Sequence, residues 1–256
     1  EAGVIGKNLT EWQYGLASTN PRWNVSGTYM QVLPCFVSID EDGNEYDFIR
    51  EYFDDLYEAM SEVFLKGYQW PFDIKKVSNG SSVIDLLVYR ERFLRNRRVY
   101  LDFRKNPFEL ENIEYEKLSK EAYEYLNNAD ACLGTPIERL KKMNTPAVEL
   151  YKNKGVDLSE ELLEISLCSQ HNNGGIAVDK WWHTNIEGLF AIGECAGTHG
   201  VARPGGSALN SGQVGALRAA TYICESLNNI CCDNKFKEIA SHSLEKHKDF
   251  IKQAFF

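Results

Sequence analysis

The 256-residue sequence lacks features that would place it in several large classes of proteins. No uninterrupted apolar run approaches the roughly 18 residues that a membrane-spanning helix requires, so we expect no membrane span. The chain has no excess of positive charge either, since 37 acidic residues against 28 basic ones give a net charge of -9. This balance argues against nucleic acids and against anionic membrane surfaces as partners.

A disulfide framework is also absent. The seven cysteines are an odd number without regular spacing, and the adjacent pair Cys231 and Cys232 cannot easily bridge each other. No histidine and cysteine residues show the spacing of metal ligands, so no metal site is expected. The pattern favours reduced thiols and a cytoplasmic location.

The last absence is a Gly-x-Gly-x-x-Gly fingerprint, the usual turn by which a nucleotide-binding unit holds phosphate. Glycine is concentrated elsewhere, in residues 188–217. An apolar run at 189–192 predicts a strand, a loop with four glycines follows, and Ser207 is a good N-cap for a helix. The helix is predicted from an apolar stripe that contains Val214, Leu217, Cys224 and Leu227.

This strand, loop and helix start would bring bare backbone N–H groups close to a ligand. Glu194, at the predicted strand tip, could accept hydrogen bonds from sugar-like hydroxyls. The alternative is an ordinary connection, but strand-to-helix loops usually have only about 2–6 residues. The residues therefore favour a cofactor site.

The same residues carry a resemblance to a known family. Residues 184–194 (Thr-Asn-Ile-Glu-Gly-Leu-Phe-Ala-Ile-Gly-Glu) resemble the second flavin-binding signature of FAD enzymes. Residues 199–209 (His-Gly-Val-Ala-Arg-Pro-Gly-Gly-Ser-Ala-Leu) resemble a run in the fumarate reductase/succinate dehydrogenase flavoprotein family, which includes L-aspartate oxidase. The similarity is densest over residues 150–225 and weaker around 99–104.

The resemblance implies FAD as the cofactor and an α+β fold. A cap domain of the fumarate reductase flavoprotein type, 20–166, would join the C-terminal part of an FAD-binding α/β domain, 167–226. Residues 1–19 would be a remnant of that FAD-binding domain, and 227–256 a helical tail. Because family members carry the phosphate-binding fingerprint long before these motifs, we expect an internal fragment that is inactive by itself and holds FAD weakly or not at all.

The implied cofactor-binding residues lie around the glycine-rich loop and the start of the helix, whose N-terminus would stabilise negative charge on a reduced flavin. They are Gly193, Glu194, Gly205, Gly206, Ser207, Ala208 and Leu209.

Three residues are implied in catalysis. Arg203 matches the arginine that grips a substrate carboxylate, a bidentate task that suits guanidinium. The alternative for Arg203 is a salt bridge that closes the loop. His199 could orient the substrate, and His171, beside a Gly-Gly turn, is either a functional or a structural histidine.

Three departures from the family pattern leave the reaction open. The histidine expected within residues 11–18 is missing, so Gln13 and Ser18 are the polar residues left, each structural or ligand-facing. Ser81-Ser82 stand where the family has its proton-donating arginine, and Gln170 stands at a substrate-binding histidine.

The expected function is hydride transfer between flavin and a small carboxylate-bearing substrate, with an electron-transfer protein as a possible partner. The alternatives are a flavoprotein with another electron acceptor or a non-catalytic binding module. A cysteine-nucleophile enzyme, with Cys195 near His199, is a more distant alternative because nothing orients that histidine.

Periodicity predicts the elements of the cap. Strands are expected at 25–40 and 98–104, and helices at 48–66, 79–94, 107–127, 136–142 and 146–154. The five arginines within 90–98 are expected to form a solvated face that pairs with acids rather than a phosphate clamp.

Overall fold

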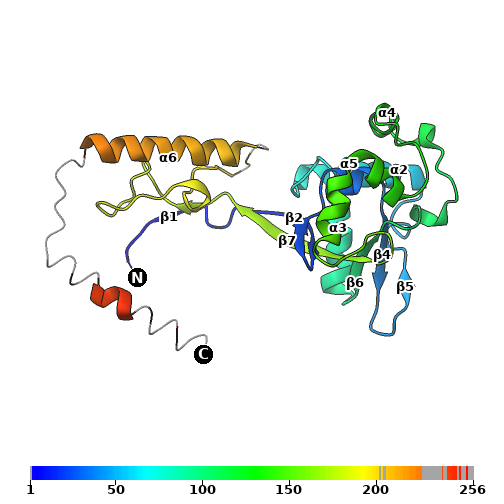
Figure 1. The fold of residues 1–256 in the computed structure, drawn as a ribbon, viewed down its shortest axis with the longest axis horizontal. Helices are drawn as coiled ribbons and strands as arrows, with labels where there is room; N and C mark the ends of the chain where they lie inside the picture. The colour runs from blue at the N-terminus through cyan, green and yellow to red at the C-terminus, as the bar shows by residue number, and fades with distance from the viewer. Residues whose placement is uncertain are drawn as a thin grey trace. The chain divides into compact units, whose positions relative to one another are not determined.

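A computed structural model describes residues 2–201, 203, 206–226, 238, 241–246, 248 and 252. The chain forms two compact units (Figure 1). The sheet unit is residues 10–172, and the loop–helix unit is residues 2–9 with the described residues from 173 onward. In the described part of the chain, no helix has the length and apolar character needed to cross a membrane.

The sheet unit contains a six-stranded antiparallel sheet with the order β3-β2-β7-β6-β4-β5. Its strands are β2 Trp12–Thr19, β3 Arg22–Asn24, β4 Cys35–Ile39, β5 Glu45–Tyr46, β6 Arg98–Asp102 and β7 Leu163–Asn172. Its α-helices are α1 Thr28–Gln31, α2 Leu56–Leu65, α3 Ser82–Tyr89, α4 Lys120–Asn128 and α5 Pro136–Lys152. Short helical turns complete it at η1 Ile74–Lys76, η2 Arg90–Leu94, η3 Pro107–Glu109 and η4 Tyr115–Lys117. A continuous apolar core fills the space between these helices and the sheet.

The strand predicted at 25–40 is wrong in its first half. Residues 28–31 form α1, and only Cys35–Ile39 forms a strand. Local β propensity is overridden because α1 is buried between α2 and α5, where the Tyr29 hydroxyl donates a hydrogen bond to the Ala147 carbonyl at 2.9 Å.

The helix predicted from residue 48 begins eight residues later. Asp55 is its N-cap, and its carboxylate accepts from the backbone N–H groups of Tyr57 at 2.8 Å and Glu58 at 3.3 Å. Ile49 and Phe53 fit the helical stripe but belong to the turns before the cap. The cap fixes the start because it satisfies the first free donors of the helix.

The helix predicted at 79–94 is confirmed as α3 continued by η2, a π-helical segment. The arginine-rich stretch pairs with acids, as expected. Glu91 is fully buried and accepts from Arg95 at 2.9 Å and Arg97 at 3.1 Å, while Arg92 pairs with Glu164 at 3.0 Å. These ion pairs connect η2 to strand β7 of the sheet.

The two helices expected at 136–142 and 146–154 form one element, α5, with non-helical dihedral angles at Asn144, two residues before Pro146. The charged stretch 107–127, expected to be one helix, contains the short turns η3 and η4 and becomes α-helical only from residue 120, where Ser119 caps α4. The strand predicted at 98–104 is confirmed as β6.

The loop–helix unit is held together largely by backbone contacts. β1 Gly6–Lys7 pairs antiparallel with β8 Gly175–Ile176, and a turn, η5 Gly193–Cys195, precedes α6 Ser207–Ser226. A Cβ atom at Gly174 would lie 1.8 Å from the Asn8 carbonyl oxygen, and one at Gly175 would lie 2.3 Å from that of Cys195. Only glycine permits this approach of three backbone segments.

Two predictions fail in this unit. Residues 189–192 do not form a strand; Phe190 makes only an isolated bridge with His183. α6 begins at Ser207 as expected, but Val214, Leu217 and Cys224 are exposed, and the buried positions are Gly215 and Ala219. The apolar stripe therefore does not face this unit. Leu227 and most of the tail at 227–256 lie outside the described residues.

Both helices and an antiparallel sheet are present, so the α+β class is confirmed. The five cysteines that the structure describes, Cys35, Cys132, Cys168, Cys195 and Cys224, are free thiols. The domain boundaries inferred from the sequence stay predictions.

Candidate functional site

The start of α6 is the centre of the predicted cofactor site. Gly206 has a φ of +77°, a left-handed conformation that glycine adopts easily, and α6 begins at the next residue, Ser207. The first turn of a helix has backbone N–H groups without intrahelical acceptors and the positive end of the helix dipole. Ser207 and Ala208 are half-buried, whereas Leu209 is 78% exposed. Gly205 lies outside the described residues.

Gly193 and Glu194 also lie next to α6. Their turn, η5, packs against α6, where a Cβ atom built on Gly212 would lie 3.5 Å from the Gly193 Cα. Gly193 has a φ of +69°, and the Glu194 side chain is exposed. The structure thus places an accessible carboxylate beside a helix that starts from a glycine turn.

An aromatic cluster also packs against α6. The Trp182 indole packs so closely on the helix that a Cβ atom at Gly215 would lie 2.5 Å from its Nε1 atom. His183 stacks 4.9 Å from the ring centre of Phe190 and 6.4 Å from that of Tyr222. His183 is half-buried, and its Nε2 atom accepts from the Gly188 N–H at 3.1 Å.

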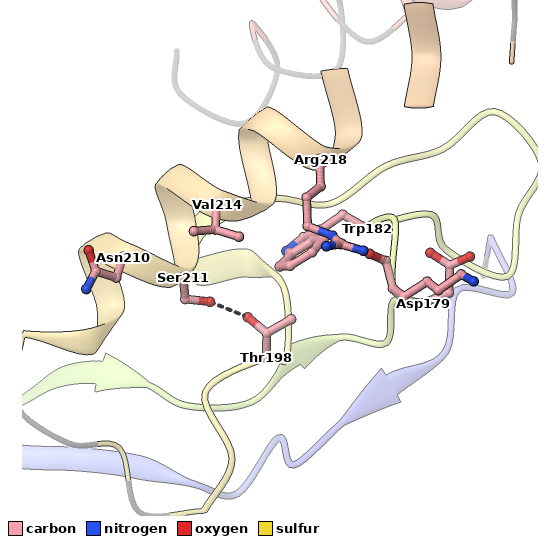
Figure 2. Close-up of a pocket in the computed structure, with 8 residues that line it drawn as sticks. Asp179, Trp182, Thr198, Asn210, Ser211, Val214 and Arg218 are labelled. Atoms are coloured by element: carbon pink, nitrogen blue, oxygen red, sulfur yellow. Dashed lines mark hydrogen bonds between the residues drawn. The ribbon is translucent and has the colours of Figure 1, made fainter. Parts of the chain in front are cut away.

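A pocket of about 500 Å³ lies along the same helix (Figure 2). Its walls are Asp179, Lys180, Trp182, Thr198, Asn210, Ser211, Val214 and Arg218.

The polar groups of this pocket are partly fixed by each other. The hydroxyls of Thr198 and Ser211 lie 2.9 Å apart, and the Arg218 guanidinium donates from Nε to the Lys180 carbonyl at 2.9 Å (Figure 2). The pocket belongs to the same loop and helix as the predicted cofactor residues, but none of those that the structure describes lines it. No sequence signal pointed to Thr198, Ser211 or Arg218, because polar residues in loops and on exposed helix faces are common.

The three predicted catalytic residues are divided between the units. His199 is buried and Arg203 half-buried in the loop–helix unit, whereas His171 is buried on β7 in the sheet unit. His171 pairs with Gln13 of β2. The next paired residues are Tyr14 and Ser169, so Gln170 is the extra residue of a β-bulge. Bulges commonly redirect side chains, and the sequence contains no pattern from which this one could be found.

The serines at the positions that depart from the family pattern are buried and hydrogen-bonded. Ser81 and Ser82 are fully buried; the Ser81 N–H donates to the Gln69 side chain at 3.1 Å, and the Ser82 hydroxyl accepts from the Asp73 N–H at 3.0 Å. Ser18 is also fully buried, and its hydroxyl accepts from the Tyr151 hydroxyl at 2.9 Å.

Ser18 therefore has a structural role. The sequence left open whether Gln13 and Ser18 are structural or face a ligand, and the contacts of Ser18 answer this question for that residue. No group of three or more histidine, cysteine, aspartate or glutamate residues arranged for a metal occurs among the described residues.

The comparisons with known proteins agree on one class. The model of the FAD binding domain matches residues 91–209. A fumarate reductase (CoM/CoB) chain of Methanothermobacter marburgensis is 39% identical over 80 residues, which are 31% of this chain and 14% of that protein. L-aspartate oxidase of Pyrococcus abyssi is 34% identical over 89 residues, 34% of this chain and 19% of that protein.

The fold has a counterpart among solved structures. A quinol-fumarate reductase solved with menaquinol molecules superposes with a TM-score of 0.55 at 18% identity, covering 97% of this chain and 38% of the other. The chain spans well under two thirds of the length of every relative named here.

The match, the glycine turn and the helix start together define an FAD-binding flavoprotein of the oxidoreductase class. The matched segments support the resemblance of this chain to the fumarate reductase/succinate dehydrogenase flavoprotein family, which includes L-aspartate oxidase. The resemblance to this family, the α+β fold of that flavoprotein type and FAD as the cofactor, each expected from the sequence, are confirmed.

Proposed function

We propose that this protein is an FAD-dependent oxidoreductase that transfers a hydride between the flavin and a small carboxylate-bearing substrate. The observation that carries the proposal is the start of α6, where a glycine turn, the first backbone N–H groups of the helix and the exposed Glu194 lie in one unit. This donor set fits FAD, because amide donors suit its anionic or electron-rich edges and a carboxylate suits its hydroxyls. When bound, FAD supplies the hydride acceptor or donor.

The protein's own residues would bind and orient the substrate. Arg203 is the proposed carboxylate ligand: its planar guanidinium can donate two parallel hydrogen bonds, and it lies half-buried on the loop that leads to α6. His199, buried four residues earlier, would hold or orient the substrate from the same loop. His171, beside the bulge at Gln170, is proposed as a third substrate-side residue.

Fumarate itself is disfavoured as the substrate. Ser81 and Ser82 replace the proton-donating arginine of the family, are closed to solvent and are engaged in hydrogen bonds to Gln69 and Asp73. A neutral serine hydroxyl is a poor proton donor at neutral pH. We therefore expect poor fumarate reduction, and turnover comparable to that of a dedicated fumarate reductase would contradict this expectation.

The test of the proposal is the substitution Arg203→Lys in the full-length, FAD-loaded holoenzyme. Lysine keeps the charge but loses the planar fork, so substrate affinity should fall about tenfold or more while the flavin content stays unchanged. The matched control is Arg92→Lys, which alters an arginine whose partner, Glu164, is on β7. The Arg92→Lys variant should have the same substrate affinity and the same flavin content as the wild type.

The alternative outcomes separate the remaining hypotheses. Normal flavin with unchanged affinity for succinate, fumarate and aspartate would make Arg203 a structural residue and remove the carboxylate substrate class. Flavin that is reduced by none of these substrates but is reoxidised by another protein would favour the alternative of a different electron acceptor. An FAD-loaded holoenzyme that is reduced by none of these substrates and passes electrons to no acceptor would favour a non-catalytic binding module. The electron-transfer partner and the cytoplasmic location are further parts of the proposal.

A further inference from the structure

The sheet unit contains a second, apolar pocket, well separated in the sequence from the cofactor motifs. Its volume is about 400 Å³, within the range usual for small-molecule sites. Four aromatic rings, two leucines and a single charged residue line it: Tyr14, Phe72, Asp85, Leu86, Tyr89, Phe93 and Leu167. Four of the apolar residues, Tyr14, Leu86, Tyr89 and Phe93, are each at least 40% exposed.

The charged residue is half of a buried ion pair. Asp85 on α3 and Lys66 at the end of α2 are each only 1% exposed, and the Lys66 ammonium donates to Oδ2 of Asp85 at 2.5 Å. Lys66 also donates to the Gln69 carbonyl at 3.4 Å. The other carboxylate oxygen, Oδ1, is buried and has no hydrogen-bond partner among the described residues. Burial raises the pKa of Asp85 to about 6.

An unpaired buried oxygen of a carboxylate is costly, because it has lost its hydrogen bonds to water without replacing them. A hydrogen-bond donor that entered the pocket would recover this free energy. Since Oδ1 is closed to water, the donor can reach it only if a lining side chain rotates. The exposed side chains of Leu86 and Tyr89, on the same helix as Asp85, are free to do so.

We propose that this pocket is a binding site for a small aromatic molecule that carries one hydroxyl group. The ring would stack among the four aromatic side chains, and the hydroxyl would donate to Oδ1 of Asp85. An aromatic hydroxyl suits the site better than an amine: Lys66 already neutralises Asp85, so a second cation would lose its hydration without a free countercharge. The site is additional to the proposed flavin chemistry and needs only residues 10–172.

The first measurement compares two probes of the same shape on the 256-residue chain. 2-Naphthol and 2-methylnaphthalene differ by a hydroxyl in place of a methyl group, and fluorescence titration gives the dissociation constant of each. We expect 2-naphthol to bind about tenfold more tightly, a difference of about 1.4 kcal/mol. Equal affinities, or tighter binding of the methyl compound, would overturn the assignment of the hydroxyl to Asp85.

The second measurement places the probe in the pocket. Leu86→Trp should fill the pocket and weaken both probes at least tenfold. Leu94→Trp is the matched control, because Leu94 is 69% exposed in η2 and does not line the pocket. It should change neither affinity. If 2-naphthol binds equally well to the wild type and to Leu86→Trp, the pocket is not its site and the proposal fails.

The third measurement removes the polar group without leaving a buried charge unpaired. The double variant Lys66→Met/Asp85→Leu replaces the ion pair by apolar side chains, a change that is often tolerated. It should bind the two probes within about twofold of each other. A preference for 2-naphthol that persists in this variant would overturn the role of Asp85, and if the variant does not fold, the first two measurements still decide the proposal.

Discussion

The two units bury apolar surface in different ways. In the sheet unit, large side chains such as Phe48, Phe64 and Leu140 are completely buried in one continuous core. Among the described residues of the loop–helix unit, the only buried hydrophobic residues are alanines: Ala191, Ala196 and Ala219. Several of its large apolar side chains, including Leu209 and Leu217 on α6, are exposed.

This difference shows that the units are stabilised by different interactions. The sheet unit gains free energy from burying side chains, about 25 cal/mol for each Å² of apolar surface. The loop–helix unit relies on close backbone contacts at glycines and on the aromatic cluster around Trp182, and gains little from burial. A unit with so little core should gain much of its stability from whatever binds to it, which suits a region that holds a cofactor.

The largest expected effect tests the buried ion pair of the sheet unit. Lys66→Met should lower the free energy of unfolding by about 3–5 kcal/mol, because the Asp85 carboxylate stays buried without a countercharge. Urea unfolding followed by circular dichroism measures the change. The double variant Lys66→Met/Asp85→Leu should restore most of it; a double variant as unstable as the single one would show that the cost comes from packing instead.

A matched pair of leucines tests the comparison between the units directly. Leu140→Ala, in α5, should cost about 2–5 kcal/mol because the side chain is fully buried and a cavity remains. Leu217→Ala, in α6, should change stability by no more than about 0.5 kcal/mol, since that side chain is 69% exposed. Thermal unfolding of both variants gives the result. A comparable loss in both would mean that Leu217 is covered in solution.

Gly174 tests the backbone contacts of the loop–helix unit. Gly174→Ala should destabilise this unit by about 1–3 kcal/mol, because the new methyl group would collide with the Asn8 carbonyl oxygen and the backbone must shift. Hydrogen exchange of residues 2–9 and 173–200 reports the loss without requiring global unfolding. Gly212→Ala is the control: its Cβ atom would make an ordinary contact, so exchange should be unchanged or slower. Equal exchange in both variants would mean that the close approach at Gly174 is relieved at little cost.

The sequence was sufficient where local chemistry decides the structure. The start of α6 follows from the glycines before Ser207, the two-part α5 from Pro146, and the pairing of the arginines with acids from the overall charge. It failed where tertiary contacts or a cap override periodicity. Asp55 moves the start of α2, and burial makes α1 a helix in a segment with strand propensity.

Several residues of the candidate site could also be predicted from the sequence. The contacts between distant segments around these residues could not. Gly193, Glu194 and Ser207 could be found because a glycine-rich loop before a helix is a local pattern. The bulge at Gln170 depends on the register between β2 and β7, which no local pattern encodes. The contact of Gly174 with Asn8 joins segments more than 160 residues apart, and only the fold shows it.

The smallest expected effect is a pH dependence that arises from the same ion pair. Burial raises the pKa of Asp85 from its ordinary value of 3.8 to about 6, even though the attraction of Lys66 acts in the opposite direction. Between these two values the folded protein holds a proton on Asp85 that the unfolded chain has released. Folding therefore takes up a proton in this window, and lowering the pH from 6 to 4 should stabilise the wild type.

The double variant Lys66→Met/Asp85→Leu isolates this effect. Asp47 and Glu62 also have pKa values raised by burial, but they are present in both proteins, so their contributions cancel in the difference. Burial lowers the pKa of Lys66, which favours the folded state toward alkaline pH instead. Urea unfolding at pH 4, 5, 6 and 7 should show the wild type gaining stability relative to the double variant on acidification. If the wild type loses stability instead, the attraction between Lys66 and Asp85 outweighs their burial, and the pair is held in its ionised form by the sheet unit.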